Sequence, residues 1–195
     1  MNIARQAAEA LPTPFDRVTA LVCAALEVPF GLVSVLEDDK ALFRSEIGLG
    51  QKSVPRDISV SAKLVAMGPD ATITILDALK DPELCGHPWV TGGPRIRFFV
   101  GATICDAAGT PIGAVGAMDV VPRDRPTPSQ MALLRHAAQL AGDLFDQITA
   151  RRAQAEQLSL LVLAEELAGL GRWRFDLVSG TVVWSDQVYR IHGRD

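Results

Sequence analysis

Two apolar segments joined by a short polar turn constrain the fold of this chain most strongly. Residues 96–105 (IRFFVGATIC) and 112–119 (IGAVGAMD) are almost continuously apolar, and the DAAGTP between them is typical of a hairpin connection. Apolar residues on both sides of a strand indicate that both of its faces are buried. We therefore expect an antiparallel sheet covered on both faces by protein, or by protein on one face and a ligand on the other.

Helices and further strands are expected around this pair. Apolar spacing predicts an amphipathic helix from about Pro14, which Pro29 closes. An EDDK turn joins two short runs into a hairpin, and Asp57 or Ser59 is placed to cap a short helix. The expected elements are residues 14–26, 30–36, 41–47, 60–67 and 72–76. Their order predicts an α+β fold in which helices flank an antiparallel sheet.

A long connection precedes the central strands. Residues 79–93 are rich in Pro, Gly and Asp, and a helical turn is predicted around residues 82–85. Loops of this length in a compact domain usually serve a function or move. We expect any ligand pocket to lie between the sheet and residues 77–94.

A long helix is predicted after residue 126. Thr127 is a suitable N-cap, Pro128 is a suitable first residue, and apolar residues then recur at alternating steps of three and four. This repeat is typical of a coiled coil, with Arg151 as its one charged member. Up to Ile148 it fits a helix packed on its own domain as well as a dimer seam, whereas beyond Ile148 it favours a partner helix and a homodimer. The candidate interface residues are Leu134, Ala141, Leu144, Ile148, Ala155, Leu158 and Val162.

Composition argues against several classes of protein. The 195 residues include 19 Lys and Arg against 23 Asp and Glu, a net charge of −4, so the positive excess that nucleic-acid binding needs is absent. No apolar run approaches the roughly 18 residues of a membrane span, and no signal peptide is recognisable. Three cysteines without a C-x-x-C spacing argue against a disulfide framework or structural zinc. We expect a cytoplasmic protein without nucleic-acid or membrane partners.

Several short motifs occur in a fixed order along residues 12–150. They are Asp77-Ala78, Asp81-Pro82, PWVTGGPRIRFFVGA at 88–102, GTPIG at 109–113, Ala117-Met118-Asp119 and Pro122-Arg123. Together with the order of elements, they resemble the GAF domain, a small-molecule-sensing module of bacterial signalling proteins. The subgroup that they resemble precedes histidine kinases or diguanylate cyclases. The resemblance implies a GAF core over residues 1–126 and a terminal helix that continues as a signalling linker over residues 127–168.

The sequence departs from the family pattern at several positions, which limits what the resemblance implies. Many relatives have Phe-Cys-Ala-His where this chain has Val60-Ser61-Ala62-Lys63, and a common Asn is His87 here. The Asn-Lys-x-Phe-Asp-Glu signature of cyclic-nucleotide-binding members is absent, as is the Cys-His pair that anchors bilins. Neither ligand is therefore expected, and the cofactor is unknown.

The tail has a separate pattern. Residues 171–177 (GRWRFDL) alternate like a strand, 178–180 form a turn, and 181–184 predict a second strand. The tail resembles the opening of a PAS domain, and residues 169–195 are too few for a whole domain. We expect a truncated PAS hairpin without a core of its own, and an output domain outside this chain.

The candidate ligand-binding residues are Arg44, Asp77, His87, Trp89, Arg97, Phe99 and Met118. An arginine aimed at a pocket would select an acidic ligand, but Arg97 could instead pair with Asp77 or Asp119 and only tie strands together. Arg44 allows the same two interpretations. The aromatic residues and Met118 could line a pocket or belong to the core. Arg97 and Phe99 share one face of their strand, and the sequence does not say which face meets the pocket.

His87 stands two residues after Cys85. The pair could bind a metal or act as a nucleophile only with a third group, such as Asp77 or Asp81; the alternative is an ordinary loop histidine. We predict neither a metal site nor a catalytic residue.

The expected function is a non-enzymatic sensory module that binds a small molecule or a protein signal. It would pass the signal through a dimeric helix to an output domain by a shift between two packings. The alternative is a GAF-fold, thiol-dependent methionine sulfoxide reductase, with Cys85 and Cys105 as the reacting pair and Cys23 as a third thiol.

Overall fold

The structure is a computed structural model that describes residues 13–168 and 173–193. It divides into two compact units, one up to Asp146 and one from Gln147, and each is described by itself. Within the described ranges, no helix is both long enough and apolar enough to cross a membrane.

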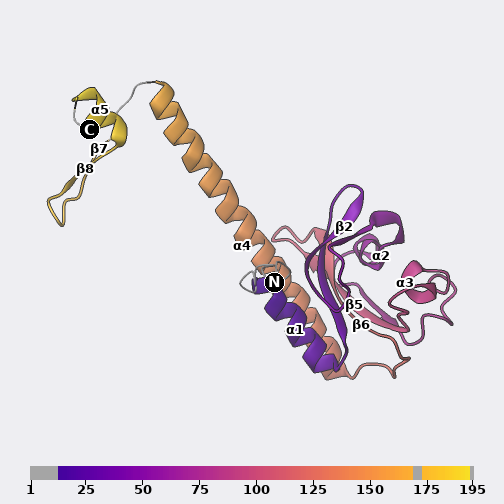
Figure 1. Cartoon of the computed structure of the whole chain (residues 1–195). Helices are drawn as coiled ribbons and strands as arrows, with labels where there is room; N and C mark the ends of the chain where they lie inside the picture. Colours follow the sequence, from indigo (N-terminus) through magenta and orange to yellow (C-terminus); the bar gives the residue numbers. More distant parts are fainter. Residues whose placement is uncertain (1–12, 169–172, 194–195) are drawn as a thin grey trace, which may run out of the picture. The chain divides into compact units, whose positions relative to one another are not determined.

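The first unit is built on one six-stranded sheet in the order β3-β2-β1-β6-β5-β4 (Figure 1). All neighbouring strands run antiparallel. The strands are β1 (Phe30–Leu36), β2 (Lys40–Ile47), β3 (Ser53–Pro55), β4 (Thr72–Ile75), β5 (Phe98–Cys105) and β6 (Pro111–Asp119). The predicted α+β class and the hairpin β5–β6 are confirmed, whereas β3 was not expected.

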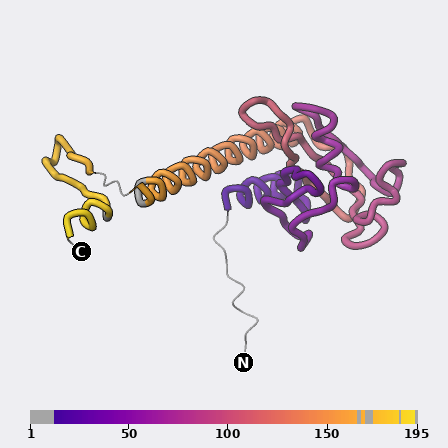
Figure 2. The backbone as a smooth tube through the Cα atoms, turned by 90° about the horizontal axis from the view of Figure 1, so that it is seen from above, coloured from indigo at the N-terminus to yellow at the C-terminus, as the bar shows by residue number. Residues whose placement is uncertain are grey.

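Helix α1 (Pro14–Leu26) and the first part of α4 (Pro128–Leu167) cover one face of the sheet, which we call the helix face. The two helices lie side by side in both views, and Gln130 Nε2 donates to the Ala25 carbonyl at 3.2 Å (Figures 1 and 2). Thr13 and Asp16 form a capping box at the start of α1. Helix α1 ends at Leu26, as expected, and its C-cap Glu27 adopts a left-handed conformation (φ 54°) before Pro29.

The other face is covered by helix α2 (Val60–Met67), the 3-10 turn η1 (Arg56–Ile58) and helix α3 (Pro88–Thr91). Ser59 caps α2 by accepting a hydrogen bond from the Ala62 N–H. The expected turn at residues 82–85 is present, because the Cys85 N–H donates to the Asp81 carbonyl at 2.9 Å. Helix α3 was not predicted. We call residues 77–97, which carry it, the lid.

Alternate residues of β5 serve the two faces. Phe99 packs in one cluster with Leu64 of α2 and Met118 of β6, so it faces the lid. Ile104 lies on the helix face, where a Cβ at Gly142 of α4 would contact its side chain. Residues 98–104 are all buried, which confirms the expectation that both faces of these strands are covered.

The Met-Asp and Pro-Arg motifs after β6 join it to α1. Arg123 Nε donates to Asp119 Oδ2 at 2.6 Å, and Arg123 Nη2 donates to the Glu27 carbonyl at 2.6 Å. Arg123 Nη1 also donates to the Leu26 carbonyl at 3.3 Å. A cation at the last carbonyls of a helix satisfies groups that the helix leaves free. The Arg123 side chain therefore holds the end of β6 to the end of α1.

The second unit contains the rest of α4 and a small tail structure. Helix α4 is continuous to Leu167 (Figure 2). Strands β7 (Trp173–Phe175) and β8 (Val182–Trp184) form the expected hairpin, followed by helix α5 (Asp186–Ile191). Trp173 and Phe175 are 65% and 47% exposed. Residues 169–172 and 194–195 of the expected PAS segment, and residues 1–12 of the GAF core, lie outside the described residues.

We predict that Gly142→Ala destabilises the first unit. Alanine normally favours a helix over glycine by about 1 kcal/mol. Here the new Cβ would overlap the Cys105 carbonyl oxygen, and overpacking of this kind costs about 1–3 kcal/mol. Chemical denaturation should show a lower free energy of unfolding. Gly86→Ala is the control, because its Cβ would meet open space. A more stable Gly142→Ala protein would contradict the close packing of α4 on β5.

Candidate functional site

A small cavity lies between the sheet and the lid, where the sequence places the pocket. Its volume is about 10 Å³, close to the space that one water molecule needs. The lining residues are Leu32, Phe43, Val54, Ile58, Ser59, Val60, Ser61, His87, Trp89 and Phe99. Three of the candidate residues thus line the cavity: His87, Trp89 and Phe99.

Arg97 and Asp77 lie at the neck of the lid. Arg97 Nε and Nη2 donate to the two carboxylate oxygens of Asp77 at 2.7 and 2.9 Å. The Ala78 N–H donates to the Arg97 carbonyl, and the Arg97 N–H donates to the Asp119 carbonyl at 2.8 Å. The geometry therefore matches the alternative in which Arg97 ties strands together. Neither residue of this ion pair lines the cavity.

The ion pair changes the titration of Asp77. Hydrogen bonds from the Arg97 guanidinium hold the pKa of the Asp77 carboxyl below its ordinary value, and the Leu79 N–H and Lys80 act in the same direction. Asp77 Oδ1 also accepts from the Leu79 N–H at 3.3 Å. The ionised Asp77 carboxylate therefore holds the two ends of the lid together through Arg97.

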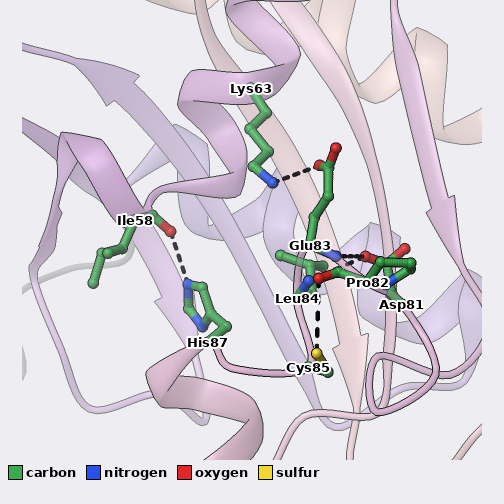
Figure 3. Close-up of polar contacts among 8 residues, drawn as sticks. All are labelled: Ile58, Lys63, Asp81, Pro82, Glu83, Leu84, Cys85 and His87. Carbon is green, nitrogen blue, oxygen red and sulfur yellow. Dashed lines mark hydrogen bonds and ion pairs between the residues drawn. The ribbon is translucent and has the colours of Figure 1, made fainter.

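His87 fastens the middle of the lid. Its Nδ1 accepts a hydrogen bond from the Trp89 N–H at 3.0 Å, so it caps α3. The proton therefore sits on Nε2, which donates to the Ile58 carbonyl at 2.8 Å (Figure 3). Both ring nitrogens are engaged by backbone groups. His87 is a structural loop histidine, and the described residues contain no cluster of three His, Cys, Asp or Glu that could hold a metal.

A further ion pair joins the lid to α2. Lys63 Nζ lies 2.8 Å from Glu83 Oε2 (Figure 3). The side chains of Lys63 and Glu83 are 42% and 75% exposed, so solvent screens their attraction. It adds little to the closure that Asp77 and His87 provide.

Trp89, which belongs to α3 in the lid, forms part of the cavity wall. It lies edge-on to Phe43, with ring centroids 6.1 Å apart, and edge-on to His87 at 5.9 Å. Its backbone carbonyl accepts from the Ile96 N–H at 2.6 Å. The main chain at Trp89 is thus fixed, while the side chain is only half-buried.

Two further candidates, Met118 and Arg44, do not line the cavity. Met118 is fully buried in the same apolar cluster as Phe99, which assigns it to the core. Arg44 is the extra residue of a β-bulge in β2, opposite the step from Val33 to Ser34. Its Nε is buried and has no hydrogen-bond partner among the described residues.

The three cysteines are not brought together at the cavity. Cys23 is buried on α1, on the helix face, and burial raises the pKa of its thiol. Cys85 is exposed, and its Sγ lies 3.7 Å from the Pro82 carbonyl oxygen (Figure 3). Cys105 is the last residue of β5, at the opposite end of that strand from the lid. All three are free thiols, and none of the described residues that line the cavity is a cysteine.

Several lining residues were not singled out from the sequence. Phe43 comes from the β1–β2 hairpin, and Ile58, Val60 and Ser61 come from the segment that enters α2. Ser61 Oγ accepts a hydrogen bond from the Ser34 hydroxyl at 2.8 Å, which links α2 to the central strand β1. The predicted cap at Ser59 was the one available signal that this helix start is a defined structure.

We predict that Asp77→Asn lowers the melting temperature by a few degrees at neutral pH. Because the pKa of Asp77 is lowered in the folded state, its charge stabilises the fold above the ordinary aspartate pKa, about 4. This stabilisation is lost as the pH falls through the lowered value, so the difference from the wild type should shrink there. Asp38→Asn, in the exposed β1–β2 turn, serves as the control. A difference that is independent of pH would contradict the role of the charge.

Comparison with known proteins agrees with the architecture. Residues 10–143 match the family model of the GAF domain. The chain is 32% identical over 126 residues to cyclic di-GMP phosphodiesterase PA2567 of Pseudomonas aeruginosa, a match that covers 65% of this chain. The chain spans only 21% of the length of that relative.

Solved structures of low identity share the fold. The GAF domain of a phosphoenolpyruvate-protein phosphotransferase from Coxiella burnetii has a TM-score of 0.60 at 15% identity, covering 71% of this chain and 84% of that one. The blue-light absorbing form of the Thermosynechococcus elongatus PixJ GAF domain has 0.58 at 11% identity, covering 74% and 90%. Free methionine-R-sulfoxide reductase from Neisseria meningitidis has 0.56 at 15% identity, covering 71% and 78%. The matched sequence and the sheet with its two helical layers show that this chain belongs to the GAF domain family.

Proposed function

We propose that this chain is a non-enzymatic sensory module of bacterial signal transduction. It binds a small molecule or a protein signal at the lid and passes the change through α4 to an output domain. The observation that carries this proposal is the position of the cavity, which lies against the same strands whose other face supports α1 and α4. Membership of the GAF family and the likeness to a blue-light absorbing GAF domain support it.

A change at the cavity has a direct route to α4. Phe99 lines the cavity, and its neighbours Phe98 and Val100 point to the helix face of the same strand. Close-packed strands pass a displacement on to the opposite face, because no free volume absorbs it. Gly142 lets α4 pack closely against the end of β5, so a displacement of β5 would move α4.

The proposed dimer seam is shorter than the sequence pattern. Leu134 and Ala141 are both 0% exposed and belong to the core of their own domain, so a partner cannot reach them. Leu144 and Ile148 are half-buried, and Leu158 and Val162 are 55% and 45% exposed. We propose that a second copy covers the stripe formed by Leu144, Ile148, Ala155, Leu158 and Val162.

This stripe suits a homodimer. Burying apolar surface contributes about 25 cal/mol per Å², or roughly 1.5–3 kcal/mol for each Leu or Ile side chain. Arg151 falls in the same stripe, and a charged residue at such a position weakens one layer while fixing the register. The alternating steps of three and four keep the stripe on one side of a left-handed pair of helices.

The matched relative supports a proposal for the output that this module controls. The matched relative is a cyclic di-GMP phosphodiesterase of which this chain spans 21%, so we propose that the module regulates cyclic di-GMP turnover and does not catalyse it.

We further propose that the hairpin β7–β8 begins a PAS domain and that the protein works in the cytoplasm. Neither nucleic acid nor a membrane is part of the proposed mechanism.

A reductase is the second candidate because free methionine-R-sulfoxide reductase shares the fold. The placement of Cys23, Cys85 and Cys105 gives this candidate no support, since a thiol reductase needs reactive cysteines at its substrate site. Thiol-dependent turnover of free methionine sulfoxide would establish it.

We predict that Ile148→Glu and Leu158→Glu weaken self-association. Each substitution places a charge in the seam, and a loss of about 1.4–2.8 kcal/mol raises the dissociation constant about 10- to 100-fold. Sedimentation equilibrium at micromolar concentration measures this. Gln157→Glu, which adds the same charge on another side of the helix, should leave association unchanged. An unchanged sedimentation profile for both seam variants would refute signal transmission through a dimeric α4.

A further inference from the structure

The lining of the cavity carries no free charge. Among its members only His87 can ionise, and backbone groups occupy both of its nitrogens. Arg97 and Asp77, the charged groups of the lid neck, are paired with each other outside the lining. Burying an ion without a partner is strongly unfavourable. An anionic or cationic ligand would therefore find no counter-charge among the lining residues, which do not include Arg44.

The remaining lining is aromatic and aliphatic, with two hydroxyl groups. Phe43, Trp89 and Phe99 supply the rings, and Ser59 and Ser61 supply the hydroxyls. Sites for small molecules are typically apolar with a few polar groups that fix orientation. Rings favour edge-to-face or offset partners with centroids 4.5–7 Å apart, and Phe43 already has such a partner in Trp89 at 6.1 Å.

Trp89 itself fills the place that such a ligand would take. With the indole in position, only about 10 Å³ remains. The Trp89 backbone is held by the Ile96 N–H and by His87 Nδ1. The indole N–H donates to no described residue, and the side chain is half-buried. The ring can therefore rotate outward without breaking the bonds that hold the lid.

From these observations we propose that Trp89 is a displaceable plug, and that the site binds an uncharged, flat aromatic molecule in place of its indole. This inference rests on the proposed sensory function and names the ligand class of that site. The ligand ring packs edge-on against Phe43 and on Phe99. Its polar group meets the hydroxyl of Ser61, which is hydrogen-bonded to Ser34 on β1. Ser34 Oγ also lies 3.2 Å from the Ala114 carbonyl on β6, so the hydroxyl next to Ser61 stands between the two central strands.

Fluorescence of the 195-residue chain tests the displacement. The chain has three tryptophans, and the double variant Trp173→Phe/Trp184→Phe leaves Trp89 as the reporter. Benzamide and benzoate are the probes, because they share a flat ring and differ in charge. Benzamide should move Trp89 emission to the red, increase its quenching by acrylamide and raise the melting temperature. Benzoate should bind about tenfold more weakly or worse, a difference of about 1.4 kcal/mol.

Trp89→Ala tests the plug. Removing the indole leaves an apolar cavity, and such cavities bind small aromatic molecules. This variant should melt at a lower temperature and bind benzamide about tenfold more tightly than the wild type, because no side chain must leave first. Trp173→Ala, at an exposed tryptophan of the tail hairpin, should bind benzamide like the wild type. Trp89→Leu keeps apolar volume in place and replaces the alanine variant if that variant fails to fold.

Four results would overturn the inference. Benzoate could bind as tightly as benzamide, benzamide could bind without changing Trp89 emission, neither Trp89 protein could bind a probe, or Trp89→Ala could bind no more tightly than the wild type. The first two leave the proposed sensory function intact, because a ligand still enters the domain. In every case the sedimentation of the α4 variants decides the signalling role separately.

Discussion

Burial of β5 and β6 on both faces is the constraint on which the rest of this structure depends. Strands without a polar side cannot lie at the surface, so helices must cover one face and a second layer must cover the other. Helices α1 and α4 supply the first layer, and α2 with the lid supplies the second. The cavity and the exit helix therefore share β5, which meets the cavity through Phe99 on one face and α4 through Ile104 on the other. A module of this architecture does not need a long chain of contacts to connect its ligand site to its output helix.

Several polar and charged residues that attract attention in the sequence hold segments of the protein together. Asp77 and Arg97 tie the ends of the lid together, His87 fastens its middle to Ile58, and Arg123 holds the end of α1. Each forms hydrogen bonds to other groups of the protein, and buried or half-buried polar groups are normally satisfied in this way. What remains at the cavity is apolar. The motif residues thus create the site by positioning its walls, while the walls themselves consist of ordinary aromatic and aliphatic side chains.

The sequence was sufficient to predict most of the helices and strands and part of the candidate site. Strand alternation, the caps at Ser59 and Thr127, and the hairpins follow from local chemistry. Because both faces of β5 are apolar, no pattern could say which face Phe99 occupies. The spacing of Leu134 fits a partner helix and its own sheet equally, and only tertiary packing places it inside. Helix α3 has four residues, too few for a periodic signal.

Hydrogen exchange measured by mass spectrometry tests the central claim, that the lid and α4 are coupled through the shared strands. His87→Ala removes the cap of α3 and the bond to Ile58 without touching the sheet or α4. The account predicts faster exchange both in residues 77–97 and in residues 130–146 of α4. Thr13→Ala, which uncaps α1, controls for a general loss of stability. Faster exchange confined to residues 77–97 would show that the lid moves independently of the exit helix, and would contradict the account.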